Sequence, residues 1–142
     1  MATTARILEQ AACLLHLNGL HTGDQFAAPG PRGALDVCAA VYVAAEKKTP
    51  VQFFTDECAS LDLIRASEPA MAAIRAISAA LDTEPCETNG APDYIEHVSN
   101  WAATPPIGET TPPTTSEVIG RILRAADTLA LDSTLPLHHH AA

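Results

Sequence analysis

The stretch "ALDVCAAVYVAAEKK", residues Ala34–Lys48, decides the fold. It is apolar on almost every side, and a helix without a polar face is usually buried on several sides. A buried strand over Val37–Val43 is the competing interpretation, but the alanines and the length of the run favour a helix. Asp36, near its start, suits the positive end of the helix dipole. The sequence therefore predicts a buried central helix over residues 34–48.

The segment before it, "TTARILEQAACLLHLNG" at residues 3–19, has the pattern of an amphipathic helix. Its apolar residues recur three and four positions apart and so form one stripe. Thr3 or Thr4 is a suitable N-terminal cap, and Gly19 is the residue type that ends helices. We expect this first helix to pack against the central one.

Two interpretations remain open for the segment that follows, Thr49–Ser67. It is either one helix that opens at Pro50, or a short turn and then a helix capped by Thr55 or Asp56. A further helix starts at Ser67, because apolar residues again recur at helical spacing beyond it.

The C-terminal half alternates loops and helices. Residues 83–92 are a loop by composition, and "DYIEHVSNWA" at 93–102 is a short helix capped by Asp93. "TPPIGETTPP" at 104–113 is a stiff connection. The last helix opens with Thr114 and Glu117, which are spaced as a capping box.

These elements predict an all-α fold of about five or six helices packed around helix 34–48. With 142 residues and one composition throughout, we expect a single domain over residues 1–132 and a disordered tail over 133–142. The first and last helices should pack against the central helix, and packing of these two helices against each other is a further option.

The sequence also resembles a known family. The features that carry the resemblance are the first helix ending at Gly19, the glycine-rich loop after it, "GALDVCAAVYVAA", "SNWAATPP" and "TSEVIGRILRAAD". Over roughly residues 5–129 the chain is similar to a small helical family of uncharacterised proteins common in actinobacteria and their phages. The resemblance implies a helical single domain of bacterial intracellular origin. It implies no catalytic residue.

Charge excludes some partners. The net charge is −9, and residues 76–120 contain seven acids and no lysine or arginine. Such a surface disfavours nucleic acid and anionic membranes, which bind clustered cations. The acids are either a solvated face or a contact surface for a basic protein, with Glu84, Glu87 and Glu96 as the candidate partner face.

Three features of the sequence bear on the cellular compartment of the protein and on its cofactors. The four cysteines form no Cys-x-x-Cys pair, the N-terminus lacks the pattern of a signal peptide, and no apolar run is long enough to cross a membrane. We therefore expect a cytoplasmic protein without a metal ion or other cofactor.

The loop "GLHTGDQFAAPGPRG", residues 19–33, contains the first candidate site. His21 and Asp24 are either a base with its orienting carboxylate, or two metal ligands, or turn residues between helices. Arg32 precedes the central helix, whose N-terminus favours anions.

The second candidate lies on the helix after Asp93. Asp93 and His97 are four residues apart and meet on one helical face, with Trp101 nearby as an aromatic wall. The alternative is a helix cap, a surface pair and a core tryptophan. A metal cluster of both pairs lacks the Glu-x-x-His spacing of helical-bundle sites, so we do not expect one.

Two function classes follow. The favoured one is a non-enzymatic protein-binding or regulatory accessory module, which acts through a protein partner or through self-association as a homodimer. The alternative is a small enzyme or small-molecule-binding protein, with a pocket formed by the His21 loop and the Trp101 region. That alternative predicts that His21, Asp24 and His97 converge within hydrogen-bonding distance.

Overall fold

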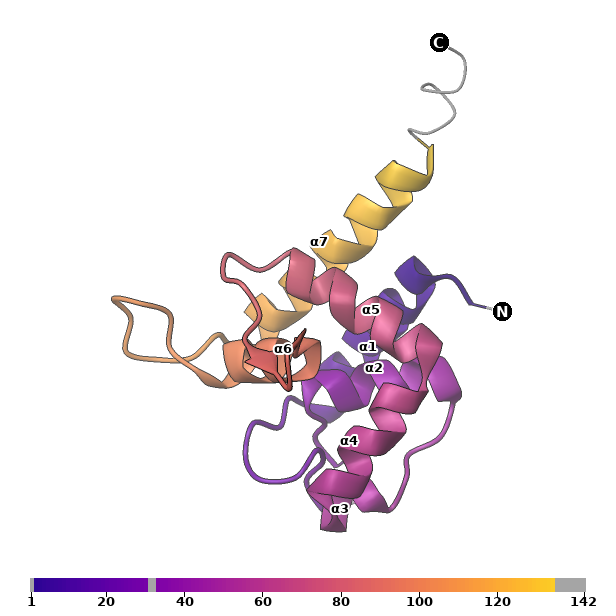
Figure 1. Ribbon diagram of the computed structural model, residues 1–142, viewed down its shortest axis with the longest axis vertical. Coiled ribbons are helices and arrows are strands. Elements are labelled where there is room, and N and C mark those ends of the chain that lie inside the picture. Colours follow the sequence, from indigo (N-terminus) through magenta and orange to yellow (C-terminus); the bar gives the residue numbers. More distant parts are fainter. Residues whose placement is uncertain (1, 31–32, 135–142) are drawn as a thin grey trace.

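The computed structural model describes residues 2–30 and 33–134 of the chain, and it confirms the all-α fold class (Figure 1). Arg32 and residues 135–142 of the expected tail lie outside the described residues. The described residues form seven helices: α1 Thr4–Asn18, α2 Val37–Glu46, α3 Gln52–Thr55, α4 Glu57–Ala66, α5 Glu68–Ala79, α6 Tyr94–Ala103 and α7 Thr115–Thr134.

Helix α2 occupies the centre, as its apolar sequence predicts. Seven of its ten residues are buried, and α1, α4, α5 and α6 pack around it. It begins later than predicted, because residue 36 has extended backbone. Asp36 caps the helix instead, and its Oδ1 accepts a hydrogen bond of 2.8 Å from the amide of Cys38.

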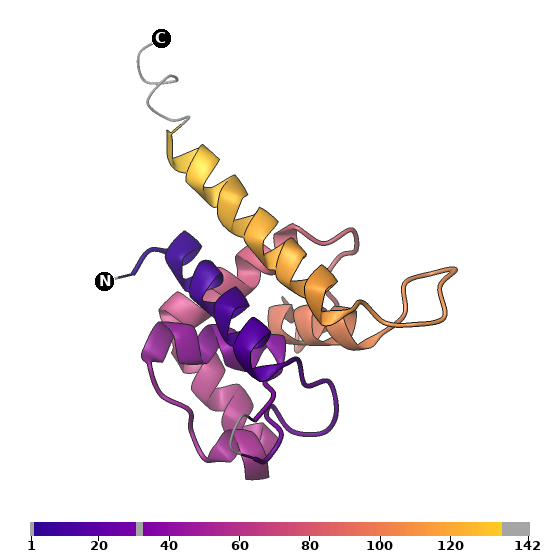
Figure 2. The ribbon, with the colours of Figure 1, turned by 180° about the vertical axis from the view of Figure 1, so that it is seen from behind.

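The two terminal helices lie side by side, which Figure 2 shows in indigo and yellow. Thr3 caps α1, and Gly19 ends it with a φ of +91°, which glycine adopts without steric cost. The expectation that the last helix packs against α2 is wrong. Helix α7 packs mainly on α1 and α5, because α1 itself covers the nearby face of α2.

The segment after α2 follows the second of its two interpretations. A short helix, α3, is followed by α4, and Asp56 caps α4 by accepting from the amide of Ala59. Ser67 then caps α5 and donates a hydrogen bond of 2.6 Å to Glu46 at the end of α2. These contacts fix α4 and α5 against the central helix.

The predicted loop at residues 83–92 contains a small hairpin that the sequence analysis missed. Strands β1 Glu87–Thr88 and β2 Ala91–Pro92 pair antiparallel across a turn at Asn89, whose φ is +54°. Each strand has two residues, which is too short for an alternating pattern to reveal.

The last helix has the predicted start and a later end. Glu117 and Thr114 exchange the two hydrogen bonds of a capping box. Helix α7 continues through Thr134, two residues past the expected end of the domain at 132. The loop before α7 projects from the body on the left of Figure 1. None of the helices in the described part of the chain is both long and apolar enough to span a bilayer.

Candidate functional site

The long connection between α1 and α2, residues 19–36, is folded back on itself by backbone hydrogen bonds. The amide of His21 donates to Leu35, the amide of Leu35 donates to Gly19, and the amide of Asp36 donates to Phe26. These bonds hold the two ends of the connection together. Residues 20–26 therefore form a fixed loop over the N-terminus of α2, and not merely a flexible turn.

Two further contacts anchor this loop to the body. The amides of Phe26 and Ala27 both donate to the carbonyl of Phe53, and the rings of Phe26 and Phe53 lie 5.9 Å apart between centroids. Gly33 comes so close to the backbone that a Cβ there would lie 2.4 Å from the carbonyl oxygen of Ala28. A side chain at Gly33 would therefore push the backbone around Gly33 away from the backbone around Ala28.

A cavity of about 340 Å³ lies beneath this loop, which is within the range of about 300–1,000 Å³ for ligand pockets. We call it the loop pocket. Its walls come from the loop, the residue that caps α2, the start of α4 and one side of α6. Its lining residues are Thr22, Gly23, Gln25, Phe26, Asp36, Glu57, Leu61, Ile95, Glu96, Ser99 and Asn100.

Asp36 is the most unusual group in the loop pocket. Its residue is only 8% exposed, and burial raises the pKa of its carboxyl group from 3.8 to about 6. Hydrogen bonds from the amides of Cys38 and Ala39 and from Ser99 oppose this rise, and so does the positive charge that His21 can carry. The carboxyl group therefore titrates closer to neutral pH than an ordinary aspartate does.

Ser99 lines the pocket beside Asp36, and Cys38 is buried next to both. The Ser99 hydroxyl lies 3.1 Å from Oδ1 of Asp36 and 3.5 Å from the sulfur of Cys38. The hydroxyl has one proton, so it donates to the carboxylate, the better acceptor of the two. Burial and the nearby negative charge of Asp36 raise the pKa of the Cys38 thiol, so it stays protonated.

Gln25 forms part of the wall in a strained conformation. Its φ is +67°, which is uncommon for a residue with a side chain. Its Oε1 is buried and has no hydrogen-bond partner among the described residues. A buried acceptor without a partner is costly in a folded protein, so a donor from a ligand would stabilise this wall.

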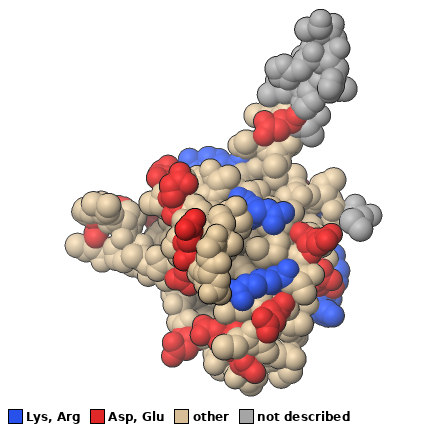
Figure 3. Space-filling view, in the orientation of Figure 1, with Lys and Arg blue, Asp and Glu red and all other residues tan. Residues whose placement is uncertain are grey.

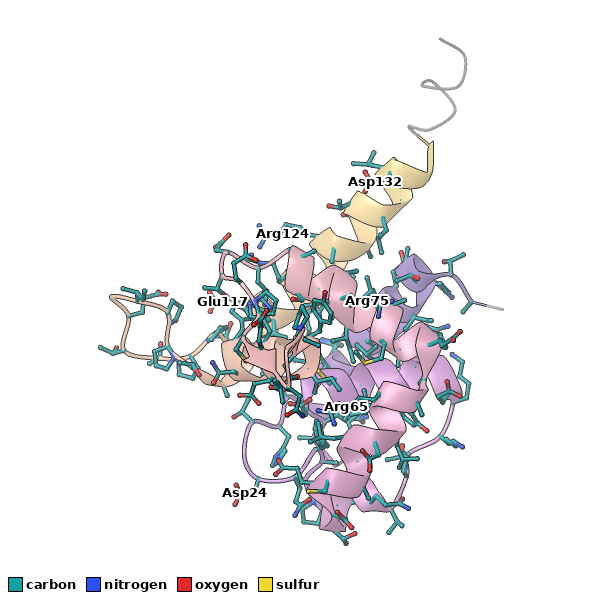
Figure 4. All side chains as sticks on the ribbon, viewed as in Figure 1. Asp24, Arg65, Arg75, Glu117, Arg124 and Asp132 are labelled. Atoms are coloured by element: carbon teal, nitrogen blue, oxygen red, sulfur yellow. The ribbon has the colours of Figure 1, made fainter. Side chains whose placement is uncertain are left out.

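The structure places His21 and Asp24 beside the pocket but does not make them a pair. Nε2 of His21 lies 2.7 Å from the backbone carbonyl oxygen of Asp24. The histidine therefore contacts the backbone of Asp24 and not its side-chain carboxylate. Figure 4 shows Asp24 at the outer edge of the loop. The pair thus has the role of turn residues, and neighbouring residues of the loop line the cavity instead.

The second candidate pair also separates. Asp93 caps α6, because its Oδ1 accepts from the amide of Glu96. His97 is buried, and its two ring nitrogens lie 2.6 Å from the hydroxyl of Ser78 and 2.8 Å from that of Thr83. Both nitrogens therefore already have partners. The expected convergence of His97 with the His21 loop is wrong.

Trp101 faces another part of the molecule. It is half-buried beside the proline-rich loop, and the guanidinium of Arg121 lies 5.9 Å from its ring centroid. It does not line the loop pocket. Within the described ranges, no three side chains of His, Cys, Asp or Glu gather in a way that could hold a metal ion.

The sequence contains only weak patterns that point to the pocket residues missed by the sequence analysis. Asp36 was noted for the helix dipole, but its burial depends on the loop that folds over it. Gln25 and Ser99 are common residue types without a recognisable spacing, since Ser99 meets Asp36 across 63 positions of the chain. The length of the connection was the one usable signal, because long ordered loops are often functional.

The fold and its pocket define a small helical protein with an acid-lined cavity under a fixed loop. A family model described as a family of unknown function (DUF6197) matches residues 1–128, and the chain belongs to this family. No curated protein and no solved structure matches the chain.

Proposed function

We propose that this protein binds a small organic cation, such as an alkylamine or a guanidinium compound, in the loop pocket. One observation carries the proposal. Three carboxyl groups line a single cavity together with Gln25, whose buried Oε1 has no hydrogen-bond partner among the described residues, and none of the described lining residues is lysine or arginine. The three carboxyl groups belong to Asp36, Glu57 and Glu96.

The electrostatics of the pocket support a cation as the ligand. Asp36 is buried, and moving its negative charge away from water is unfavourable unless an opposite charge compensates it. A bound ammonium or guanidinium group would supply that charge and would lower the raised pKa of Asp36. Its N–H groups would also serve Oε1 of Gln25, which lacks a donor.

The proposal is tested by titration calorimetry with four cations of increasing length: ethanolamine, choline, putrescine and agmatine. Succinate serves as the anionic control compound. We expect at least one cation to bind and succinate to give no heat of binding. Asp36→Asn and Glu57→Gln should each weaken the affinity about tenfold or more, because each removes an attractive charge at short range.

Glu109→Gln provides the matched control. Glu109 is exposed in the proline-rich loop and does not line the loop pocket, so its neutralisation changes the net charge without changing the site. Equal weakening by Glu109→Gln and Glu57→Gln would show an unspecific charge effect and would overturn the proposal. So would the absence of binding by all four cations.

A protein-binding role remains the second candidate, supported by the exposure of the acidic face. Glu84, Glu87 and Glu96 are all exposed, and none of them forms an ion pair with a described residue. Reversing Glu84 and Glu87 to lysine should weaken capture of a basic partner. Glu96 is less suited to this test because it also lines the loop pocket.

The finer expectations from the sequence also belong here as proposals. We propose a cytoplasmic location, and the four unpaired cysteines support it. Self-association as a homodimer, a non-enzymatic role and an origin in actinobacteria or their phages are further proposals that rest on the sequence alone.

A further inference from the structure

The proline-rich loop, residues 104–113, presents an isoleucine to solvent at its tip. Ile107 is fully exposed, and it is the most exposed of the large apolar residues in the described part of the chain. The amide of Glu109 donates a hydrogen bond of 2.9 Å to the carbonyl of Pro106, and Gly108 between them has a φ of +86°. These two features close a tight turn around Ile107. Its side chain is therefore held at a fixed place outside the body of the molecule.

The loop around this turn is stiff and projects from the body. Two prolines lie on each side of the turn, at 105–106 and at 112–113, and each proline fixes its own φ. The loop projects on the left of Figure 1, and in Figure 3 the same projection is tan and red without any blue. A single exposed apolar side chain is common on proteins. One that is presented on a stiff loop is suited to binding, because little conformational entropy is lost when it docks.

An apolar groove of about 350 Å³ lies elsewhere on the body, between the C-terminal halves of α1 and α2. We call it the α1–α2 groove. Leu17 is 63% exposed there, and Leu14 and Val43 are half-buried, so apolar surface remains open to solvent. Cys13 and Ala44 complete the apolar walls. None of the described residues that line the groove belongs to the proline-rich loop of the same chain.

The α1–α2 groove carries one positive charge. Lys47 is the one charged residue among the described residues that line it, and its ammonium group donates a hydrogen bond to the neutral amide of Gln10. The acids that neighbour these two residues in the sequence are engaged elsewhere. Glu9 pairs with an arginine of its own helix, and Glu46 accepts from the serine that caps α5. The groove is thus positive in a chain whose net charge is −9.

The proline-rich loop complements this groove in polarity and in charge. Ile107 offers an aliphatic side chain to the apolar walls. Glu109 follows it by two positions, is exposed, and is the one charged residue of the loop. Opposite charges on two surfaces favour their encounter and fix the orientation in which they meet. A carboxylate beside the isoleucine is therefore well placed to contact a lysine beside the groove.

We propose that the proline-rich loop of one copy docks in the α1–α2 groove of a second copy of this chain, with Ile107 on the apolar walls and Glu109 against Lys47. The contact joins two different surfaces, unlike a contact between one surface and its own copy. This inference rests on the proposed self-association, to which it gives contact residues, and not on the proposed cation ligand.

Sedimentation equilibrium of the full chain tests this contact. Protein concentrations from about 10 µM to about 1 mM are needed, because a contact of small area is weak. We expect the mean mass to rise with concentration. Ile107→Glu and Leu17→Glu should each weaken the association about tenfold or more, because each places a charge in an apolar contact. Both positions are exposed in the single copy, so both variants should fold.

Mixing the two variants is the decisive measurement. Ile107→Glu keeps its groove and Leu17→Glu keeps its loop, so an equimolar mixture has one intact loop for each intact groove. We expect the mixture to form complexes of two copies at concentrations where each variant alone is a monomer. A contact of either surface with its own copy would not be restored by mixing. A mixture that stays monomeric would therefore refute the proposed contact.

Val51→Glu is the matched control. Val51 is a 67% exposed apolar residue outside both surfaces, and its replacement adds the same charge. We expect its association to stay within about twofold of the unchanged protein. Equal weakening in all three variants would overturn the proposal as an unspecific charge effect. Self-association that Ile107→Glu and Leu17→Glu leave intact would overturn this contact alone, whereas a monomer at every concentration would overturn self-association as well.

Discussion

His97 and Ser78 form a buried hydrogen bond of 2.6 Å between the imidazole Nδ1 and the serine hydroxyl, which ties α6 to α5. The other ring nitrogen contacts Thr83 in the loop that follows α5. The histidine that the sequence offered as a ligand is thus a structural link between two helices and a loop.

Replacing His97 should therefore lower stability and not ligand binding. His97→Ala leaves the Ser78 hydroxyl buried without a partner and opens a cavity, so the free energy of unfolding should fall by about 2–4 kcal/mol. Urea denaturation measures this difference. His16→Ala is the control, because His16 is exposed on α1, and it should change stability by less than about 0.5 kcal/mol. Similar effects of the two substitutions would contradict the structural role of His97.

Asp36 should make the protein less stable as the pH rises. Burial raises the pKa of its carboxyl group from 3.8 to about 6, so the folded state holds this proton more tightly than the unfolded state does. This contribution of Asp36 to stability is fully present below the pKa that its carboxyl group has in the unfolded state. It is lost as the pH rises through the higher pKa of the folded state. Over the whole range from below the unfolded pKa to above the folded pKa it amounts to about 3 kcal/mol.

Comparing urea denaturation of the unchanged protein with Asp36→Asn isolates this effect. The asparagine keeps a side-chain oxygen to cap α2 but cannot titrate. We expect the difference in unfolding free energy between the two proteins to change with pH in this window. A constant difference for Asp36→Asn would contradict the raised pKa.

Sequence patterns predicted the helices well because local signals set them. Four helices have caps that spacing alone reveals, because each capping side chain accepts a hydrogen bond from the amide three positions further on. The caps are Thr3, Asp56, Asp93 and Thr114. The loop pocket depends on contacts between distant segments, such as that between Asp36 and Ser99. No local pattern encodes such a contact. Only the folded loop reveals which of many acids is buried.

The four cysteines should differ sharply in reactivity. Cys13, Cys58 and Cys86 are exposed, whereas Cys38 is buried and its thiol has a raised pKa. A disulfide reagent such as dithionitrobenzoate should therefore label three thiols rapidly and the fourth only on unfolding in urea. Four rapid equivalents in the folded protein would contradict the burial of Cys38.

We expect Gln25 to contribute to cation binding and not to the stability of the fold, because its backbone is strained. Gln25→Gly removes the strain at positive φ and also removes the unpartnered buried oxygen, so it should not lower the unfolding free energy. The same substitution should weaken cation binding, which calorimetry measures. Asp24→Gly is the comparison, since Asp24 has an ordinary φ in the same loop and should lose about 0.5–1 kcal/mol. A clear loss of stability in Gln25→Gly would contradict the strain.

The most direct test of the loop pocket is the number of protons released when a cation binds. Calorimetry of agmatine binding at a pH near the Asp36 pKa of about 6, in buffers with different heats of ionisation, gives this number. The account predicts release of about half a proton in the unchanged protein, because the cation lowers the pKa of a half-protonated Asp36. It predicts none for whatever binding remains in Asp36→Asn. Binding without proton release, or equal release in the two proteins, would contradict it.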